Sequence, residues 1–316
     1  MKSLVIHIGA HKTGTTMIQS CFDRNRKVLK SLGVIYPKSN WYHHSQHRLA
    51  FAMKGMKDPT TGADCNYKSE IDELNAEIES APNNSTIFIS SEEFFSAPVE
   101  KITELRDNVA CDAVRIIAFV RSPDDLFLSF YNQNTKEPRN SFFKTVSSLI
   151  DNPLNINPDM HMGECVLNWA GVFGNESVSL HCYEDASPLE VILNALKLPS
   201  ETITAPARIN ESVPAAVVEI MRLSKYFAMS LEARIDLYTA ANRIFAGSPR
   251  VILAKEDRQK ILKAAQRDLD GLFSGFGRQN PYRQCRLSSS SEANHPVRQV
   301  KILMELVEAL LQERRR

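Results

Sequence analysis

The sequence predicts an α/β fold, a three-layer parallel β-sheet with a helical C-terminal extension. Four β-rich runs are nearly continuous in apolar character, and the gaps between them are long enough for helical crossovers, as in parallel sheets covered on both faces. After Pro214 the strand signals fade and amphipathic runs take over. We therefore expect a core over residues 1–213 and a helical extension over 214–316 that packs on this core as part of the same domain.

The predicted elements follow in chain order. Strands are expected at residues 4–8, 86–90, 114–120 and 177–182, with a weaker run at 33–37. Apolar residues from Met17 to Leu32 recur at helical spacing, and Gly33 is placed to end that helix in a left-handed cap. The amphipathic runs of the extension cover 214–228, 231–246, 256–274 and 297–312, with a Ser-rich linker at 288–291.

The loop after the first strand, Gly9 to Thr16 (GAHKTGTT), joins that strand to the first predicted helix. A strand, a tight turn and a helix N-terminus present backbone N–H groups to an anion, so we expect this loop to bind a phosphate or a group of that shape. Lys12 precedes the second glycine, whereas the lysine of a nucleotide-cleaving Walker loop follows it. The loop is P-loop-like in its arrangement without having the Walker sequence.

Every strong strand of the predicted sheet ends in a polar cluster. The clusters are the glycine loop, Ser90–Glu93, Arg121–Asp124 and Tyr183–Asp185. Ligands of open parallel sheets bind beyond the carboxyl ends of the strands, so we expect these clusters to share one crevice. Ser122 and Pro123 match the N-cap and first position of a helix, which places Arg121 beside a second helix N-terminus suited to a second anion.

These motifs resemble those of the sulfotransferases that use 3'-phosphoadenosine 5'-phosphosulfate (PAPS), particularly the bacterial and carbohydrate-type branch. The run Lys12-Thr13-Gly14-Thr15-Thr16 is similar to the loop that holds the 5'-phosphosulfate in that family. Arg121 at a strand end, with Ser129 eight residues later, is similar to the pair that holds the 3'-phosphate. A weaker third match is the segment from Arg208 to Ser212 (RINES).

The resemblance implies transfer of a sulfuryl group from PAPS to a hydroxyl of an acceptor, such as a carbohydrate or glycolipid, with release of adenosine 3',5'-bisphosphate. Donor contacts are implied for Lys12, Thr13, Gly14, Thr15, Thr16, Arg121 and Ser129. Lys12 is also suited to a catalytic role, because a fixed positive charge stabilises the charge that develops on the leaving phosphate. We expect no metal in this step.

The acceptor hydroxyl has to lose its proton to a base, and the sequence leaves two groups of candidates open. The resemblance favours His47 first and His44 second within the cluster of histidines after the second short strand. Glu92 or Glu93 is the alternative, since some relatives use a glutamate. General-base assistance is worth about 10²–10⁴-fold in rate.

Composition narrows the possible partners and compartment. The net charge of the 316 residues is +1, which argues against a surface devoted to nucleic acid or anionic lipid. We expect neither a signal peptide nor a membrane span, because the first apolar run is short and no later one approaches a membrane's thickness. Six scattered cysteines without a C-x-x-C pair favour reduced thiols. These features predict a cytoplasmic enzyme with a small-molecule or glycan acceptor.

Two other functions are compatible with the glycine loop. A nucleotide or metabolite kinase needs a lysine where this sequence has Thr15, and a Mg²⁺-binding carboxylate at a strand end. The nearest carboxylates, Asp124 and Asp125, fall in the predicted helix start. A non-catalytic nucleotide-binding module would keep the anion sites and lack the base.

Overall fold

The computed structural model describes residues 1–199, 201, 203, 213–248, 250 and 253–284 of the chain. The motif at 208–212, the linker at 288–291 and the predicted helix over 297–312 lie outside the described residues. The chain divides into two compact units. The first comprises Met1–Ser122, His161–Ile209 and Arg267–Asn280, and the second comprises Pro123–Met160, Asn210–Gln266 and Pro281–Arg316. The predicted boundary after residue 213 stays a prediction.

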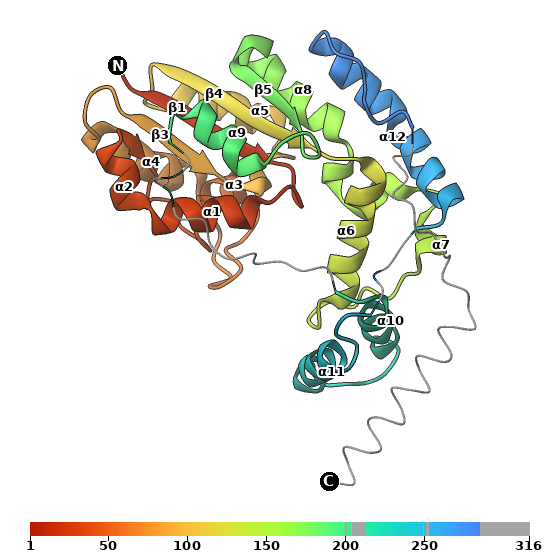
Figure 1. Cartoon of the computed structure of the whole chain (residues 1–316). Coiled ribbons are helices and arrows are strands. Elements are labelled where there is room, and N and C mark those ends of the chain that lie inside the picture. Colours follow the sequence, from red (N-terminus) through yellow and green to blue (C-terminus); the bar gives the residue numbers. More distant parts are fainter. Residues whose placement is uncertain (200, 202, 204–212, 249, 251–252, 285–316) are drawn as a thin grey trace. The chain divides into compact units, whose positions relative to one another are not determined.

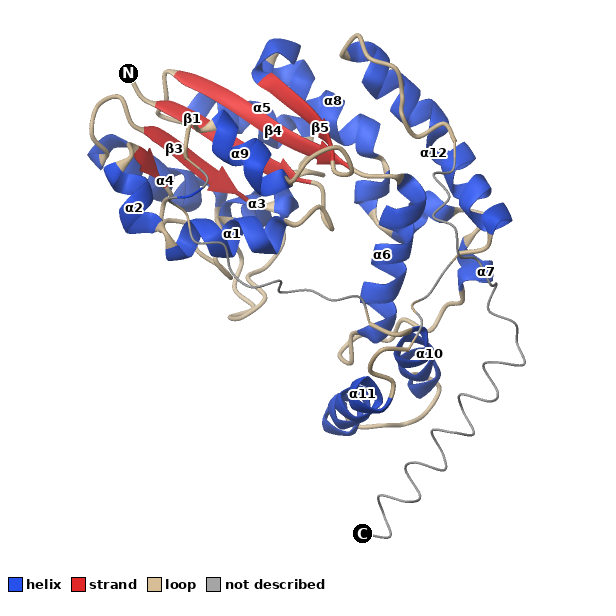
Figure 2. Cartoon of the chain, viewed as in Figure 1, coloured by secondary structure: helices blue, strands red, loops and turns tan. Residues whose placement is uncertain are grey.

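The first unit is built on a five-stranded sheet in which all neighbouring strands are parallel (Figure 2). The strands are β1 (Ser3–Gly9), β2 (Val34–Ile35), β3 (Thr86–Ser90), β4 (Ala113–Val120) and β5 (Val178–Cys182). Their order across the sheet is β2-β3-β1-β4-β5, so β1 lies in the centre between β3 and β4. All five predicted strands are confirmed.

Helices cover both faces of this sheet (Figure 1). One face is covered by α1 (Thr15–Arg24), α2 (Arg26–Ser31) and α9 (Pro188–Ala195), whose apolar side chains pack with Val5, Phe88 and Phe119. The other face is covered by α5 (Val99–Asn108) and α8 (Met162–Phe173). The three-layer α/β class predicted from the sequence is confirmed.

Four further elements of the first unit lie between consecutive strands in the sequence. Helix α3 (His47–Met53) and helix α4 (Tyr67–Ser80) connect β2 to β3. Two short 3₁₀ helices, η1 (Glu92–Phe94) and η4 (Asn175–Ser177), lie immediately after β3 and immediately before β5.

The described part of the second unit is helical. It contains α6 (Pro123–Lys136), α7 (Val146–Leu149), η2 (Pro153–Ile156), η3 (Pro158–Met160), α10 (Ala215–Ser224) and α11 (Leu231–Ile244). Helix α12 (Lys255–Gly275) begins in the second unit and ends in the first. The helices predicted at 214–228, 231–246 and 256–274 are confirmed as α10, α11 and α12.

The single helix predicted up to Leu32 is wrong, because α1 ends at Arg24 and α2 begins at Arg26. Asn25 between them leaves helical geometry, and its side-chain Nδ2 donates to the carbonyl of Cys21 at 2.8 Å. The backbone N–H of Asn25 donates to the same carbonyl at 3.2 Å, so the side chain and the backbone share this acceptor where the helix is interrupted. Gly33 has a φ of +81°, as expected for the left-handed residue that ends the second helix.

Candidate functional site

The glycine loop links the central strand to the first turn of α1. Gly14 precedes the helix in the left-handed conformation, with a φ of +83°. Thr13 is fully buried and its hydroxyl donates to the carbonyl of Ala10 at 2.6 Å, which closes the loop on itself. Met17 and Ile18 donate their backbone N–H groups to the carbonyl of Gly14, at 3.1 and 3.3 Å, so Thr15 and Thr16 are the residues of α1 whose N–H groups precede any acceptor in the helix. An anion is the ligand that these donors favour.

Lys12 occupies the middle of the loop with a φ of +65°. A residue with a Cβ rarely takes this left-handed conformation, and such strained residues cluster at functional sites. Thr15 is buried at the start of α1, whereas Thr16 is exposed beside it. The loop therefore offers both backbone donors and a threonine hydroxyl at the helix N-terminus.

Arg121 directly follows β4, and its side chain contacts the glycine loop. Its Nη1 donates to the carbonyl oxygen of Lys12 at 2.8 Å, and its guanidinium carbon lies 5.0 Å from the ring centre of Tyr183. Because β1 and β4 are neighbours and their connections lead to opposite edges of the sheet, the two loops that follow them flank a switch point of the sheet. Ligands of open α/β sheets bind at such points.

The other members of the predicted 3'-phosphate motif fall in two units. The backbone N–H of Ser122 donates to Oε1 of Glu184 at 2.8 Å, so the polar clusters after β4 and β5 contact each other in the first unit. Pro123 is the first residue of α6, as predicted. Ser129 lies further along α6, in the second unit, and its role stays a prediction. Asp124 and Asp125 both accept hydrogen bonds from Arg258.

The structure separates the two histidines proposed as a base. His44 is exposed, and its Nδ1 lies 2.5 Å from a carboxylate oxygen of Asp23, near the C-terminal end of α1. His47 is the first residue of α3 and is 7 % exposed, with its Nδ1 2.6 Å from the hydroxyl oxygen of Ser91. His47 therefore lies at the carboxyl end of β3, which is where the first unit carries its other polar clusters.

Gln46 holds this part of the chain against β3. Its side-chain oxygen accepts the backbone N–H of Ser90 at 3.0 Å, and its side-chain nitrogen donates to the carbonyl of Pro37 at 2.8 Å. Gln46 is fully buried and directly precedes His47. These bonds fix the start of α3 and thereby the position of the His47 ring.

The two adjacent glutamates have different environments. Glu93 pairs with Lys54 at 2.7 Å and with His11 at 3.2 Å. Burial alone would raise the pKa of Glu93, but the bonds and charges of His11 and Lys54 outweigh it and lower the pKa to about 2. Glu92 instead accepts a hydrogen bond from Nε2 of Gln19 at 2.7 Å and lies 4.0 Å from Nε2 of His47. Glu93 is an ion-paired structural residue, whereas Glu92 faces the histidine.

The protonation states of this pair follow from its surroundings. Burial lowers the pKa of His47, so the ring is neutral at pH 7. Burial opposes the ionisation of Glu92, yet the neighbouring histidines and the Gln19 amide outweigh it and hold the pKa of Glu92 below its ordinary value. A neutral imidazole and an ionised carboxylate can both take part in proton transfer at neutral pH.

Sequence reasoning assigned no supporting role to the buried polar residues around this pair, although Ser90 and Ser91 belong to the predicted cluster at Ser90–Glu93. Gln19 and Ser91 contact it directly. His7 lies one layer further in, where its Nδ1 is 2.9 Å from the hydroxyl of Ser90. Burial lowers the pKa of His7 to about 4, so this ring is neutral as well. A histidine inside an otherwise apolar strand was the signal that could have revealed this network.

Gly9 brings the start of the loop against Glu92. A Cβ at Gly9 would lie 3.0 Å from the Cα of Glu92, closer than ordinary van der Waals contact, and the φ of Gly9 is +92°. Only a residue without a side chain allows this approach in this conformation. The glycine loop and the His47–Glu92 pair therefore lie at the same end of the sheet.

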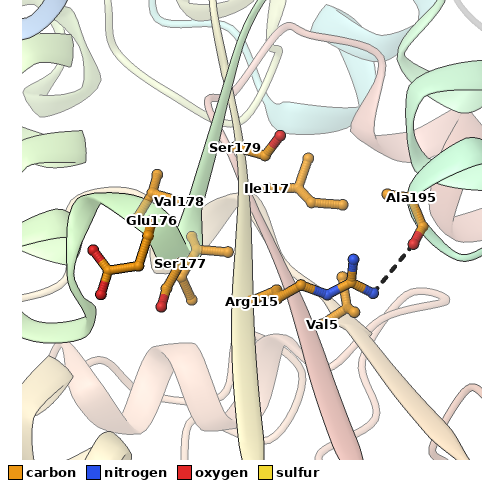
Figure 3. Close-up of a pocket in the computed structure, with 9 residues that line it drawn as sticks. Val5, Arg115, Ile117, Glu176, Ser177, Val178, Ser179 and Ala195 are labelled. Atoms are coloured by element: carbon orange, nitrogen blue, oxygen red, sulfur yellow. Dashed lines mark hydrogen bonds between the residues drawn. The ribbon is translucent and has the colours of Figure 1, made fainter. Parts of the chain in front are cut away.

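A cavity of about 220 Å³ lies elsewhere in the first unit, near the amino-terminal ends of β4 and β5 (Figure 3). Val5 and Ile117 give it an apolar wall, and Arg115 donates to the carbonyl of Ala195 at 3.1 Å. Its lining contains none of the loops that follow the strands. We assign this cavity no part in the chemistry.

The helices and side chains of the described part of the chain, residues 1–199, 201, 203, 213–248, 250 and 253–284, bear on two features, a membrane span and a metal site. None of its helices is both long enough and apolar enough to cross a membrane. Within the same residues, no three side chains of His, Cys, Asp or Glu form a group that could hold a metal ion.

The chain matches no protein-family model, and it matches no curated protein by sequence. Among solved structures it is similar to the crystal structure of a sulfotransferase from Alicyclobacillus acidocaldarius. The two share 14 % sequence identity, with a TM-score of 0.42 over 73 % of this chain and 98 % of the other. At this TM-score the likeness supports no statement about the activity of this chain.

Proposed function

We propose that this protein is a PAPS-dependent sulfotransferase. The observation that carries the proposal is the bond from Arg121 to the carbonyl of Lys12, two residues that lie 109 positions apart in the sequence. It joins two loops suited to anions, at the ends of neighbouring strands. A ligand with negative charge at two separate places, such as a nucleotide with a 5'-phosphosulfate and a 3'-phosphate, fits this arrangement.

Each loop receives a role in the proposal. Lys12, Thr13, Gly14, Thr15 and Thr16 hold the 5'-phosphosulfate, chiefly through backbone N–H groups at the start of α1. Arg121 holds the 3'-phosphate, because a guanidinium offers paired donors to phosphate oxygens, and the part of Ser129 stays the prediction drawn from the sequence. The donor supplies a sulfuryl group that passes in line to the acceptor hydroxyl. The charge of Lys12 stabilises the leaving phosphate.

The acceptor side of the reaction uses the His47–Glu92 pair. Its two side chains lie at the same end of the sheet as the glycine loop and are 4.0 Å apart. One of them takes the proton of the acceptor hydroxyl, which we propose belongs to a carbohydrate or another small molecule. His44 has no place in this step, because it pairs with Asp23 near the far end of α1.

Thermal stability with three nucleotides tests the donor. Adenosine 3',5'-bisphosphate should raise the melting temperature more than ADP, and more than ATP with Mg²⁺, because only the bisphosphate carries a phosphate at the 3' position as well as at the 5' position. Ligand at about 100 times its Kd adds about 2.7 kcal/mol of stability. Larger stabilisation by ATP with Mg²⁺ would replace the proposal with a kinase. Binding of the bisphosphate without transfer to any of a panel of sugars would leave a nucleotide-binding module.

Two variants separate the roles of the cations. Lys12→Ala should lower kcat by about 10²–10³-fold, because it removes a fixed charge at the leaving group. Arg121→Ala should chiefly raise the KM for PAPS, by about tenfold to a hundredfold, since a charged hydrogen bond is worth about 1.5–3 kcal/mol. Steady-state kinetics checks both, with Lys68→Ala as the control, because the Lys68 side chain is 84 % exposed on α4. Full turnover in Lys12→Ala would contradict its role.

A further inference from the structure

We propose that Ser91 is a positioning residue that fixes His47 as an N–H donor and thereby makes Glu92 the group that takes the acceptor's proton. The inference rests on the proposed function and deepens it at the same site. It is carried by the hydrogen bond between Ser91 and Nδ1 of the His47 ring and by the carboxylate of Glu92, which lies 4.0 Å from Nε2 on the other side of the ring.

Nδ1 of His47 faces the buried hydroxyl of Ser91. The hydroxyl oxygen of Ser91 accepts the backbone N–H of Glu93 at 3.1 Å, and Ser91 is fully buried. Its own hydrogen needs an acceptor, and within the described chain that acceptor is Nδ1 of His47 at 2.6 Å. When Nδ1 accepts a hydrogen bond, a neutral imidazole carries its proton on Nε2.

Nε2 of His47, on the other side of the ring, faces the carboxylate of Glu92. This nitrogen lies 4.0 Å from Oε2 of Glu92. A proton on Nε2 is attracted by the carboxylate, whereas a lone pair there would be repelled by it. The remaining neighbours of the ring are aromatic, with Phe51 stacked at 5.8 Å and Tyr42 edge-on at 6.0 Å between ring centres. Both sides of the ring therefore favour the same tautomer.

Glu92 is held ready for the proton by α1 and by the glycine loop. Gln19 donates to its Oε2 at 2.7 Å, so the carboxylate has a fixed orientation. The bare Cα of Gly9 lets the loop pass directly beside the backbone of Glu92. About 15 % of the Glu92 side chain stays exposed, which leaves room for contact with a bound hydroxyl.

Sulfuryl transfer and proton transfer take place in one step. The acceptor hydroxyl gives its proton to a carboxylate oxygen of Glu92, and the hydroxyl oxygen forms a bond to sulfur. The bond between sulfur and the bridging oxygen breaks, and its electron pair leaves on the phosphate of adenosine 3',5'-bisphosphate. His47 keeps its proton throughout, because its Nε2 has no lone pair in this tautomer.

The tautomer can be measured without any turnover. In protein labelled with ¹⁵N-histidine, at about pH 8 where a histidine of ordinary pKa is neutral, the two ring nitrogens of His47 have distinct shifts. The His47→Gln spectrum identifies the signal. We expect Nδ1 unprotonated in the wild type and a changed Nδ1 signal in Ser91→Ala. Ser85→Ala, a buried serine just before the other end of β3, should leave it unchanged. A proton on Nδ1 in the wild type would overturn the inference.

Kinetics of two matched variants test the consequence. Glu92→Gln removes the proton acceptor and should lower kcat by about 10²–10⁴-fold. His47→Gln keeps an N–H donor without a basic nitrogen and should lose less than about tenfold. A loss in His47→Gln as large as that in Glu92→Gln refutes the assignment. If the wild type has the expected tautomer but transfers no sulfuryl group, the proposed function is wrong and the inference about the tautomer stands. If the wild type is active but has the opposite tautomer, this inference is wrong and the proposed function stands.

Discussion

Gly9 shows how a single residue can satisfy two constraints at once. It takes a positive φ, and its missing Cβ is what lets the loop approach Glu92. Gly62 has a comparable φ of +69°, but a Cβ there would meet nothing within 4 Å. Substitutions at Gly9 and Gly62 therefore distinguish the effect of backbone strain from the effect of losing the close approach to Glu92.

Gly9→Ala should cost more activity than stability. Gly62→Ala should lower the free energy of unfolding by about 1–2 kcal/mol, the cost of a left-handed residue with a side chain, and Gly9→Ala should lower it by more, because its Cβ would also crowd the backbone of Glu92. Only Gly9→Ala should also reduce transfer, by about tenfold or more, because it displaces Glu92 from the loop. Urea unfolding and initial rates measure the two effects. Equal activity in the two variants would count against a catalytic role for this contact.

At the level of elements, the N-terminus of α8 is capped by a carboxylate from α12. Asp268 accepts the backbone N–H groups of Gly163 at 2.6 Å and Glu164 at 2.9 Å. These are orphan donors of the first helical turn. A Cβ at Gly163 would lie 2.3 Å from the carbonyl oxygen of Asp268, so glycine is needed for the two helices to approach.

Removing this cap should destabilise the protein without touching the site. Asp268→Ala should lower the free energy of unfolding by about 1–2 kcal/mol, as measured for other helix caps, and Asp268→Asn by less because one acceptor remains. Denaturant unfolding checks this, with Asp72→Ala as a control at a carboxylate that is 60 % exposed. An unchanged midpoint in Asp268→Ala would show that solvent replaces the cap.

Periodicity was enough to predict the strands and the helices α10 to α12, because it reflects which faces are covered. It could not predict the break at Asn25, which depends on one side-chain bond to Cys21. The glycine loop was also predictable, since local spacing sets its geometry. The pairing of His47 with Ser91 was not, because it depends on how Gln46 docks on β3, a contact between residues 44 positions apart.

Acid should destabilise the whole molecule through groups in its first unit. The folded pKa of His7 is lowered from 6.5 to about 4 by burial, so between these values the unfolded chain binds a proton that the folded chain does not. Stability therefore falls as the pH drops through this window, by up to about 3 kcal/mol. The folded pKa of Glu93 is lowered from 4.5 to about 2, so the free energy of unfolding decreases further as the pH drops from 4.5 to about 2.

The histidine contribution can be isolated. His7→Asn keeps a polar partner for Ser90 and removes the titrating ring, so its unfolding midpoint in urea should change less between about pH 7 and about pH 5 than that of the wild type. Lys101→Ala, a surface change on α5, serves as the control for an unrelated substitution. The same slope in His7→Asn and wild type would assign the acid sensitivity to other groups.

The central place of β1 has a consequence for biosynthesis. Ser3 pairs with Thr86 on one side and with Ala113 on the other, so β1 is translated before both of the strands with which it pairs. Pairing between residues that lie far apart in the sequence slows folding, and until it is complete the apolar side chains and the unpaired edges of the strand can associate with other chains. The glycine loop is thus translated before Arg121, which donates to the carbonyl of Lys12 in that loop, and a nascent chain stalled between these two residues should depend on chaperones.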